Sequence, residues 1–442
     1  MTSDVTPDSI VDEPAPVVVG LGDLAVALTI GGADPAARLA ATGARPVLTA
    51  GVRFCDGRGA TLTDVLGIGV ADGAPPPHDV PDAAHHPEPV AFPDSLQADV
   101  PDALPRPSTG PLLREALLRS LSAPDPDGAT WVAGDPADLV LDGDAGVLRL
   151  DRATGAGVAA AVAGDGRAGA LDAYLGARLA VARAYRDVVT TGARPLAAVH
   201  HVRTGHVERP AAHWHLERVA AGIADACRDL GLRTTNGGVT VVAVDDAPAR
   251  PVPVVAVLGG FDDVGRATPS GWLEPGQVIY QLGATREDLA GSHWAWAEHA
   301  HLGGVPPQVD AAAERLLGDL LVNSSRDGLV DAAHALSAGG LARALARACL
   351  RSGVGARVWL DGVCDRDGVS PFLALFAESP ARAVAAVPRS EEIRFTDMCV
   401  ARGYPVVRIG VVDDQAGPDG GQALDVQGLF TVPLDDLRAA AG

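Results

Sequence analysis

Two glycine-rich turns are the residues of this sequence whose types and spacing best suit phosphate chemistry. One is Asn236–Gly238 with Thr240 close behind it, and the other is Gly339 with Gly340 at the start of an amphipathic segment. Backbone N–H groups at such a turn can point at an anion, and a following helix adds a favourable dipole. The alternative is that each turn needs a positive φ for packing alone, because glycine adopts that conformation freely. The sequence leaves both interpretations open.

Five histidines lie close together in the sequence, at positions 200, 201, 206, 213 and 215. Neighbouring residues of a strand point to opposite faces, so His200 and His201 do not converge on one ion. His213 and His215 on a helix diverge by about 200°. No two histidines have the spacing of a zinc-binding helix, so we predict no metal site formed by side chains here. The Gly-x-Ser-x-Gly setting of serine hydrolases is also absent from the sequence.

Composition excludes several classes of protein. The 35 basic side chains are all arginines, so a Schiff-base lysine and a P-loop lysine are both impossible. The formal charge is −21 and the chain has no basic run, which argues against nucleic-acid binding. The five cysteines form no Cys-x-x-Cys pair, as expected of buried thiols in a reducing compartment. Without a signal-like start or an apolar run of about 18 residues, we expect a cytoplasmic protein with no membrane partner.

The pattern of apolar residues predicts four zones: a strand-rich segment at 1–73, a proline-rich linker at 74–110, a first lobe at 111–268 and a second lobe at 269–442. Helical periodicity predicts helices at 111–123, 173–189, 211–230, 309–321 and 340–351, with Asp172 as an N-cap. Strands are expected at 139–143, 146–151, 195–202, 237–244, 251–261, 277–283, 356–362, 378–388 and 405–414. Strands and helices alternate without a strict βαβ order, which favours an α+β fold.

The ordered segments then resemble a known family. They are DAYLGARLAVARAYRDVVTTGARPLA, ERPAAHWHLERVAAGIADACRDLG, PVPVVAVLGGFDDVGRATPSGW, AHALSAGGLARALARACLRSG and LFAESPARAVAAVP. From about residue 125 to residue 436 the chain is similar to the C-terminal half of the large subunit of phosphoribosylformylglycinamidine synthase, in the aminoimidazole ribonucleotide synthase superfamily. Several segments in the right order are far more specific than one short motif.

The resemblance implies a synthase-type N-lobe, built on a mixed sheet with helices, and a smaller α+β C-lobe. It also implies a reaction of purine biosynthesis, with ATP and Mg²⁺ as cofactors. ATP would phosphorylate the amide oxygen of formylglycinamide ribonucleotide, and ammonia would displace the phosphate to give the amidine. The expected partners are a related half-subunit, as a homodimer or heterodimer, and a glutaminase that supplies ammonia.

The family's motifs map onto this sequence with several departures. Around the nucleotide or substrate, the matching positions are His200 in place of an acidic residue, Gly237, and Gly238 in place of an amide that binds Mg²⁺. Thr240 keeps the hydroxyl of a substrate-binding serine. In the second turn Ala335 and Ala338 replace two acidic residues, whereas Gly339 and Gly340 remain and are expected near a phosphate. The Glu-Ser-x-x-Arg run is kept as Glu378, Ser379 and Arg382, of which the first two are expected to contact substrate.

Two hypotheses of function follow. In the first, the chain is the C-terminal module of an amidine-forming, ATP-dependent ligase and works with a separate first half, or as a homodimer on a related amide. In the second, it is a non-catalytic paralogue that acts as a scaffold or regulatory subunit. The retained glycines and Thr240 favour the first hypothesis, and the lost acidic and amide groups favour the second. The residue types identify no catalytic side chain.

Overall fold

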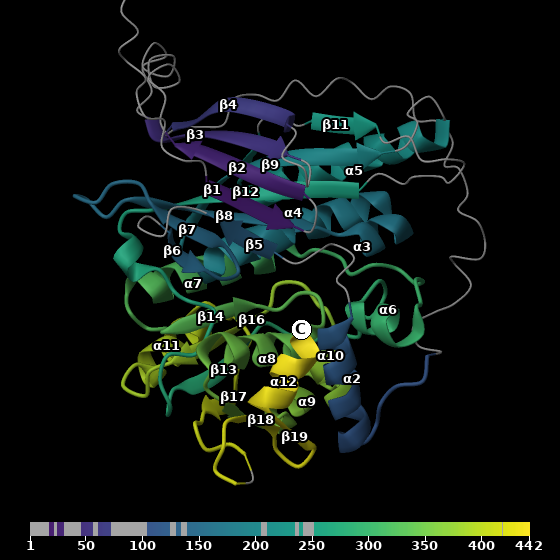
Figure 1. The fold of residues 1–442 in the computed structure, drawn as a ribbon, viewed down its shortest axis with the longest axis vertical. Coiled ribbons are helices and arrows are strands. Elements are labelled where there is room, and N and C mark those ends of the chain that lie inside the picture. The colour runs from purple at the N-terminus through teal and green to yellow at the C-terminus, as the bar shows by residue number, and fades with distance from the viewer. Residues whose placement is uncertain are drawn as a thin grey trace, which may run out of the picture.

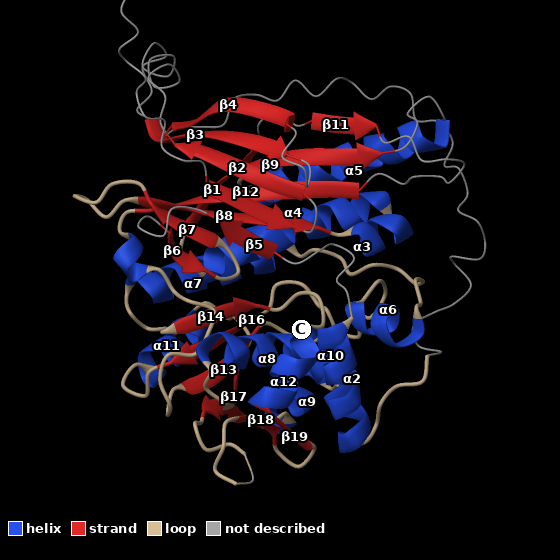
Figure 2. Ribbon diagram, in the orientation of Figure 1, coloured by secondary structure: helices blue, strands red, loops and turns tan. Residues whose placement is uncertain are grey.

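Three β-sheets and one central layer of helices organise the chain (Figure 1). The computed structural model describes residues 17–21, 24–30, 46–55, 61–71, 104–123, 130–133, 139–204, 210–234, 238–241, 252–417 and 419–442. Figure 2 shows helices lying between the upper strands and the lower sheet. The first lobe contains the central sheet, and the second lobe contains the lower sheet.

The sheet of the first lobe has the strand order β10-β9-β12-β8-β7-β6, and β11 also pairs with β9. Its strands are β6 (Leu139–Asp142), β7 (Gly146–Arg149), β8 (Gly157–Gly164), β9 (Arg194–Thr204), β10 (Arg233–Thr234), β11 (Gly238–Val241) and β12 (Val252–Phe261). β8 and β12 contain no polar or charged side chain, because both faces of these central strands are buried.

A layer of helices covers the lower face of this sheet. It contains α4 (Ala173–Thr190), α5 (Pro210–Leu230) and α7 (Ala311–Arg326), and the short α3 (Gly166–Leu171) precedes α4. Val181 and Tyr185 of α4 share one hydrophobic cluster with Leu317 and Leu320 of α7. The first lobe therefore packs directly against a helix that comes from the second half of the chain.

The sheet of the second lobe has the order β14-β16-β13-β17-β15-β18-β19. Its strands are β13 (Val278–Leu282), β14 (Ala332–Ala335), β15 (Ala356–Val358), β16 (Ala383–Val387), β17 (Val406–Val412), β18 (Ala423–Val426) and β19 (Phe430–Pro433). Val278 and Tyr280 face the central helices, whereas Ile279 faces a second cluster on the other side. This alternation is what a strand with two buried faces requires.

Helices cover the outer face of the lower sheet. They include α8 (Gly340–Ser352), α9 (Asp361–Asp367), α10 (Pro371–Phe376) and α12 (Leu434–Ala441), and α6 (His293–His299) packs into the same outer cluster. By contrast, α11 (Glu392–Ala401) and the 3₁₀ turn η3 (Val264–Arg266) contribute to the central cluster, and η3 contacts β7 of the first lobe. Helix α2 (Gly110–Ser122) also packs here, because Leu113 and Leu117 belong to the second cluster. The predicted division of the lobes at residue 268 stays a prediction, but α2 lies against the second lobe although it precedes the first in sequence.

The N-terminal segment forms strands, as its apolar runs predicted. β1 (Val17–Leu21), β2 (Leu24–Ile30), β3 (Pro46–Cys55) and β4 (Thr61–Ala71) make an antiparallel sheet that β5 (Thr130–Ala133) extends beside β1. This sheet lies over the upper face of the first lobe's sheet (Figure 1). Most of the linker predicted at 74–110, namely residues 74–103, lies outside the described residues.

The predicted α+β fold is confirmed. The five predicted helices are present, and the Asp172 side chain caps α4 by accepting from the N–H groups of Tyr174 and Leu175. The strand predicted at 356–362 is wrong after Val358, because α9 begins at Asp361. The strand predicted at 378–388 starts only at Ala383, because Ala381 has a φ of 53° that no regular strand contains.

Replacement of Gly340 by alanine should strongly destabilise the chain. Gly340 has a φ of +63°, and an added Cβ would lie 2.6 Å from the Leu375 carbonyl oxygen and 2.7 Å from that of Ala377. Left-handed strain alone costs about 1–2 kcal/mol, and the clash adds to it. We expect urea denaturation to show a loss of more than about 2 kcal/mol. Gly368→Ala is the matched control, because Gly368 also has a positive φ but no atom within 4 Å of the added Cβ. Equal effects of the two substitutions would refute the packing argument.

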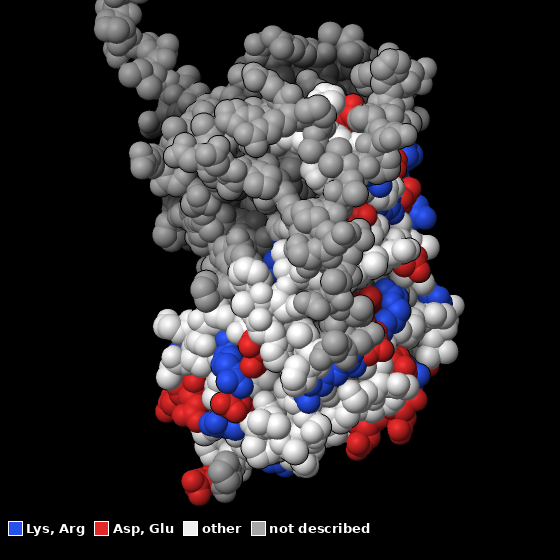
Figure 3. All heavy atoms as spheres, turned by 90° about the vertical axis from the view of Figure 1, so that its right-hand side faces the viewer, with Lys and Arg blue, Asp and Glu red and all other residues white. Residues whose placement is uncertain are grey.

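No described helix is long and apolar enough to cross a bilayer. On the face drawn in Figure 3, acidic and basic side chains are interspersed over the lower lobe. Exposed ion pairs among the described residues include Arg326 with Asp327, 2.9 Å apart. Isolated surface pairs of this kind contribute little to stability.

Candidate functional site at the lobe junction

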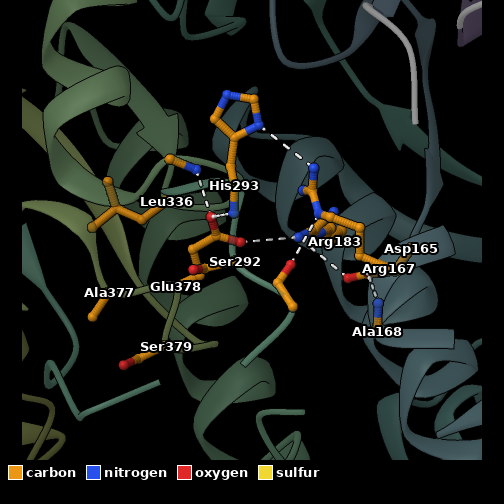
Figure 4. A network of polar contacts seen from close by, with 12 residues as sticks. Asp165, Arg167, Ala168, Arg183, Ser292, His293, Leu336, Ala377, Glu378 and Ser379 are labelled. Carbon is orange, nitrogen blue, oxygen red and sulfur yellow. Dashed lines mark hydrogen bonds and ion pairs between the residues drawn. The ribbon is translucent and has the colours of Figure 1, made fainter. Parts of the chain in front are cut away.

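Buried charged side chains gather where α3 and α4 of the first lobe meet the loops of the second (Figure 4). Glu378, which follows α10, is at the centre of this junction network. One of its oxygens, Oε1, accepts from the backbone N–H of His293 at 2.6 Å and from that of Gly339 at 2.8 Å. These N–H groups lie at the starts of α6 and α8, where helices have unsatisfied donors. The Glu378 carboxylate therefore occupies a position in which a bound anion could lie.

Arg183 of α4 connects Glu378 to the first lobe. Its guanidinium lies 3.5 Å from Glu378 Oε2 and 3.2 Å from Asp165 Oδ2. Asp165 in turn caps α3 by accepting from the N–H of Ala168 at 3.0 Å. Because the Arg183 and Asp165 side chains are nearly buried, this contact is screened less than a surface pair. One ion-paired chain thus joins β8, α4 and the second lobe.

His293 forms the other side of the junction. Its Nε2 lies 2.8 Å from the Ser120 carbonyl oxygen, and its Nδ1 lies 3.5 Å from Arg167 Nη1. These contacts suit the tautomer in which Nε2 carries the proton and Nδ1 accepts. Arg167 also donates through Nε to the Gly291 carbonyl oxygen at 2.9 Å. The ring therefore connects α2 to α3 across the two lobes.

The predicted residues of the second lobe converge at this junction. The Gly339 amide donates to Glu378 and the Gly340 amide donates to the Ser337 carbonyl oxygen, so both N–H groups have partners within the chain. The Ser379 hydroxyl accepts from the N–H of Arg286 at 2.8 Å. These contacts account for the residues structurally, and their contact with substrate or phosphate stays a prediction.

The predicted residues of the first lobe form a separate group. His200 lies on β9, and Gly238 pairs with the next residue of that strand, His201, from β11. Burial lowers the pKa of His200, and its Nδ1 has no hydrogen-bond partner among the described residues. Gly237 lies outside the described residues, as does the side chain of Thr240. The contact of His200, Gly237, Gly238 and Thr240 with nucleotide or substrate stays a prediction.

Asp144 is a second polar centre, and sequence reasoning missed it. It lies in the turn between β6 and β7 and reaches the second lobe. Its Oδ1 contacts His334 Nδ1 and lies 3.2 Å from Arg351 Nη1, and its Oδ2 accepts from the Ala335 N–H at 2.8 Å and the Thr190 hydroxyl at 3.2 Å. Burial would raise the pKa of this carboxyl, but the charges of His334 and Arg351 and these hydrogen bonds lower it to about 2.

The pKa of Asp187, which lies one helical turn from Arg183 and next to Arg186, is displaced in the opposite direction. Removal from water, together with the nearby charge of Asp144, raises its pKa to about 8. The positive charges of Arg186, Arg183 and Arg351 lower the pKa, but not enough to offset these effects. Two carboxyl groups with displaced pKa values in opposite directions are typical of functional sites, although structural networks also produce them.

Replacement of Asp187 by asparagine should remove one pH dependence of stability. The folded pKa of about 8 exceeds the ordinary 3.8, so the folded chain holds this proton more tightly than the unfolded chain. The free energy of unfolding must then fall as the pH rises from about 4 to about 8. We expect Asp187→Asn to be more stable than the wild type at pH 8 by at least about 1.4 kcal/mol, the equivalent of one pKa unit. Parallel pH profiles of the two proteins in urea denaturation would refute the raised pKa.

Among the described residues, the positions that the family resemblance assigns to Mg²⁺ do not fit this ion. Mg²⁺ requires oxygen ligands in near-octahedral geometry. Gly238 has no side chain and Ala335 has only a methyl group, and the Ala335 amide donates to Asp144. The two oxygens of Asp144 already accept from four donors in total, two at each oxygen. Among the described residues, no group of three or more His, Cys, Asp or Glu side chains is placed to hold a metal ion.

Comparisons with known proteins agree with this geometry. Residues 142–261 match the family described as AIR synthase related protein, N-terminal domain, and residues 274–420 match the corresponding C-terminal domain. Together the two matches span more than half of the chain. The first match covers strands β7 to β12 of the first lobe, and the second covers strands β13 to β17 of the second lobe.

Curated relatives carry the name phosphoribosylformylglycinamidine synthase subunit PurL. That of Frankia casuarinae is 49% identical over 362 residues, which cover 80% of this chain and 46% of the relative. That of Streptomyces avermitilis is 47% identical over 355 residues, or 78% of this chain and 46% of the relative. The chain thus spans less than half the length of these relatives.

Among solved structures, Thermotoga maritima PurL complexed with FGAR has a TM-score of 0.57 and 23% identity, covering 68% of this chain and 48% of that one. The same protein complexed with ATP has a TM-score of 0.52 and 21% identity, covering 73% of this chain and 48% of that one. These likenesses show a shared fold.

Proposed function

We propose, since the chain belongs to the AIR synthase related superfamily, that it serves as one half of an ATP-dependent, amidine-forming ligase of purine biosynthesis. Its substrate would be formylglycinamide ribonucleotide or a closely related amide. The observation that carries the proposal is the identity of 47–49% to PurL subunits across both lobes. Thermotoga maritima PurL, which shares the fold, is complexed in separate structures with FGAR and with ATP.

A second, related half would complete the active site, and a glutaminase would supply ammonia. The support for a partner is that the chain matches less than half of each PurL relative, and that a structure named PurLQS exists for the Thermotoga maritima protein. At the junction, this half would contribute electrostatic positioning, because phosphoryl transfer depends mainly on placement and charge stabilisation. Arg183, His293 and Glu378 would fix the relative position of the two lobes around the ligand.

A non-catalytic role has specific support as a second candidate. Ala335 and Ala338 lack the carboxylates that the family resemblance implies, and the Gly339 amide already donates to Glu378. A subunit with these features could still bind nucleotide and act as a scaffold or regulator. The two candidates differ in whether the chain supports turnover.

Complementation separates the candidates. The chain is expressed with and without a separate first half in a strain that lacks its own large subunit, and the two halves together should restore growth without purines. Growth only when both halves are present supports the ligase role, and growth with the first half alone would show that this chain is dispensable. Titration calorimetry with ATP and with formylglycinamide ribonucleotide checks binding directly. A stable complex with the first half that binds neither ligand and does not restore growth would favour the scaffold.

A further inference from the structure

A cavity of about 250 Å³ lies beside Asp144, between the β6–β7 turn, the end of α4 and the end of α8. Its polar lining includes Thr190, Thr268, Ser270 and Arg351. Pockets for drug-sized ligands occupy about 300–1,000 Å³, so this cavity suits a small group rather than a whole nucleotide. None of the residues predicted from the sequence lines it.

Arg351 lines this cavity, and its hydrogen bonds among the described residues do not use all of its donors. Its guanidinium donates to Asp144, to the Ser270 hydroxyl and to the Gly143 carbonyl oxygen. A guanidinium carries five N–H groups, so these three contacts leave donors available. The side chain is 34% exposed, so the remaining donors can reach a ligand. Arginine is also the side chain best suited to a phosphate, because two parallel N–H groups match two of its oxygens.

Ser270 adds a buried hydroxyl. Its oxygen accepts from Arg351, which leaves its own proton available to a ligand, and the residue is only 6% exposed.

Two glycines keep this space open. A Cβ on Gly143 would lie 2.9 Å from the Ser270 hydroxyl oxygen, and one on Gly271 would lie 3.1 Å from Arg351 Cβ. The glycines therefore allow the guanidinium and the hydroxyl to line one space.

The carboxyl groups near this cavity are paired or protonated. Asp144 is its only carboxylate among the lining residues, and this group already accepts from His334, Arg351, Thr190 and the Ala335 amide. Asp187 holds its proton near neutral pH because its pKa is raised to about 8. A divalent cation finds no free carboxylate oxygen here, whereas an anion finds guanidinium and hydroxyl donors.

We propose that this cavity binds a phosphate group of the chain's ligand through Arg351 and Ser270, without a divalent cation. The inference rests on the proposed function to the extent that the ligand is phosphorylated. It deepens that function by assigning positive charge at this position to a guanidinium, which is permanently charged and needs no metal. Other phosphate groups of the same ligand are outside this inference.

The test measures binding of inorganic phosphate and of ADP to the full-length chain by titration calorimetry, once with EDTA and once with Mg²⁺. Arg351→Gln removes the guanidinium, and we expect it to weaken binding about tenfold or more, as loss of a charge-assisted hydrogen bond implies. Leu273 lies at the rim and is 53% exposed, so substitutions there should leave the fold intact. We expect Leu273→Glu to weaken binding and Leu273→Lys to strengthen it. Arg394→Gln is the control, because Arg394 is an exposed residue of α11 that pairs with Glu391.

Binding in EDTA that Arg351→Gln and Leu273→Glu weaken and Arg394→Gln does not would support the proposal. Binding that requires Mg²⁺, or that is equal in the Arg351 and Arg394 variants, would overturn it and leave the proposed function intact. Absence of any phosphate or ADP binding would overturn it too, while complementation still decides the proposed function. Arg351→Gln also alters the surroundings of Asp144 and could fold poorly. In that case the two substitutions at the rim, Leu273→Glu and Leu273→Lys, still test the proposal.

Discussion

Replacement of Asp144 by alanine should lower the free energy of unfolding by about 3–5 kcal/mol, the usual cost of removing one partner from a buried ion pair. The substitution leaves His334 and Arg351 without their carboxylate and leaves the Ala335 amide without its acceptor. It also separates the β6–β7 turn from the second lobe. Urea denaturation at pH 7 measures the effect.

Acid should have a related effect on the wild type. The folded pKa of about 2 lies below the ordinary 3.8, so the stability that Asp144 contributes is present above pH 4 and disappears as the pH falls toward 2. Asp229→Ala is the matched control, because Asp229 pairs with Arg178 at 2.8 Å but is 41% exposed. That variant should lose less than about 1 kcal/mol. Similar losses in the two variants would contradict the assignment of Asp144 as a buried connection between the lobes.

Replacement of Glu378 by alanine should cost about 3–5 kcal/mol for the same physical reason. Two backbone N–H groups, those of His293 and Gly339, would lose their shared acceptor, and Arg183 would lose one of its two carboxylates. Glu378→Gln should cost less, because its amide oxygen can still accept from the two N–H groups. Thermal and urea denaturation of both variants would establish this order.

Glu287→Ala provides the control for Glu378, since Glu287 pairs with Arg106 at 2.5 Å but is 53% exposed. A loss below about 1 kcal/mol is expected there. If Glu378→Ala were no more harmful than this control, the carboxylate would not satisfy the amides as described. If Glu378→Ala were stable and bound phosphate where the wild type did not, the carboxylate would be a substitute for a bound anion.

The main helices and strands were predictable because their apolar residues recur at clear periods. α5 buries one face, α4 is a largely apolar helix that is buried on most sides, and β12 is a continuous apolar run. The α6, α9 and α10 helices have only six or seven residues each, which is too short for a periodic pattern to emerge. They depend on caps and on tertiary packing, as Ser370 shows by accepting from the Leu373 N–H at the start of α10.

The candidate site was predictable only in part. Glycine turns are visible in a sequence, so Gly339 and Gly340 were identified, and the family resemblance brought in Glu378 and Ser379. Asp144 and Arg351 are 207 positions apart, and nothing local indicates that they meet. One signal was available: Arg183, Arg186 and Asp187 are charges within a helix that is otherwise largely apolar. Charged side chains in such a helix must find partners, so they mark a buried polar contact.

Helix α7 shares its hydrophobic cluster with α4 although the two come from different halves of the chain. Neither family-matched segment can therefore bury its apolar surface by itself. Heating should melt both segments in a single transition, with equal calorimetric and van't Hoff enthalpies. Cleavage of the connection between residues 261 and 274 should yield two fragments that remain associated and that fail to refold once they are separated in denaturant.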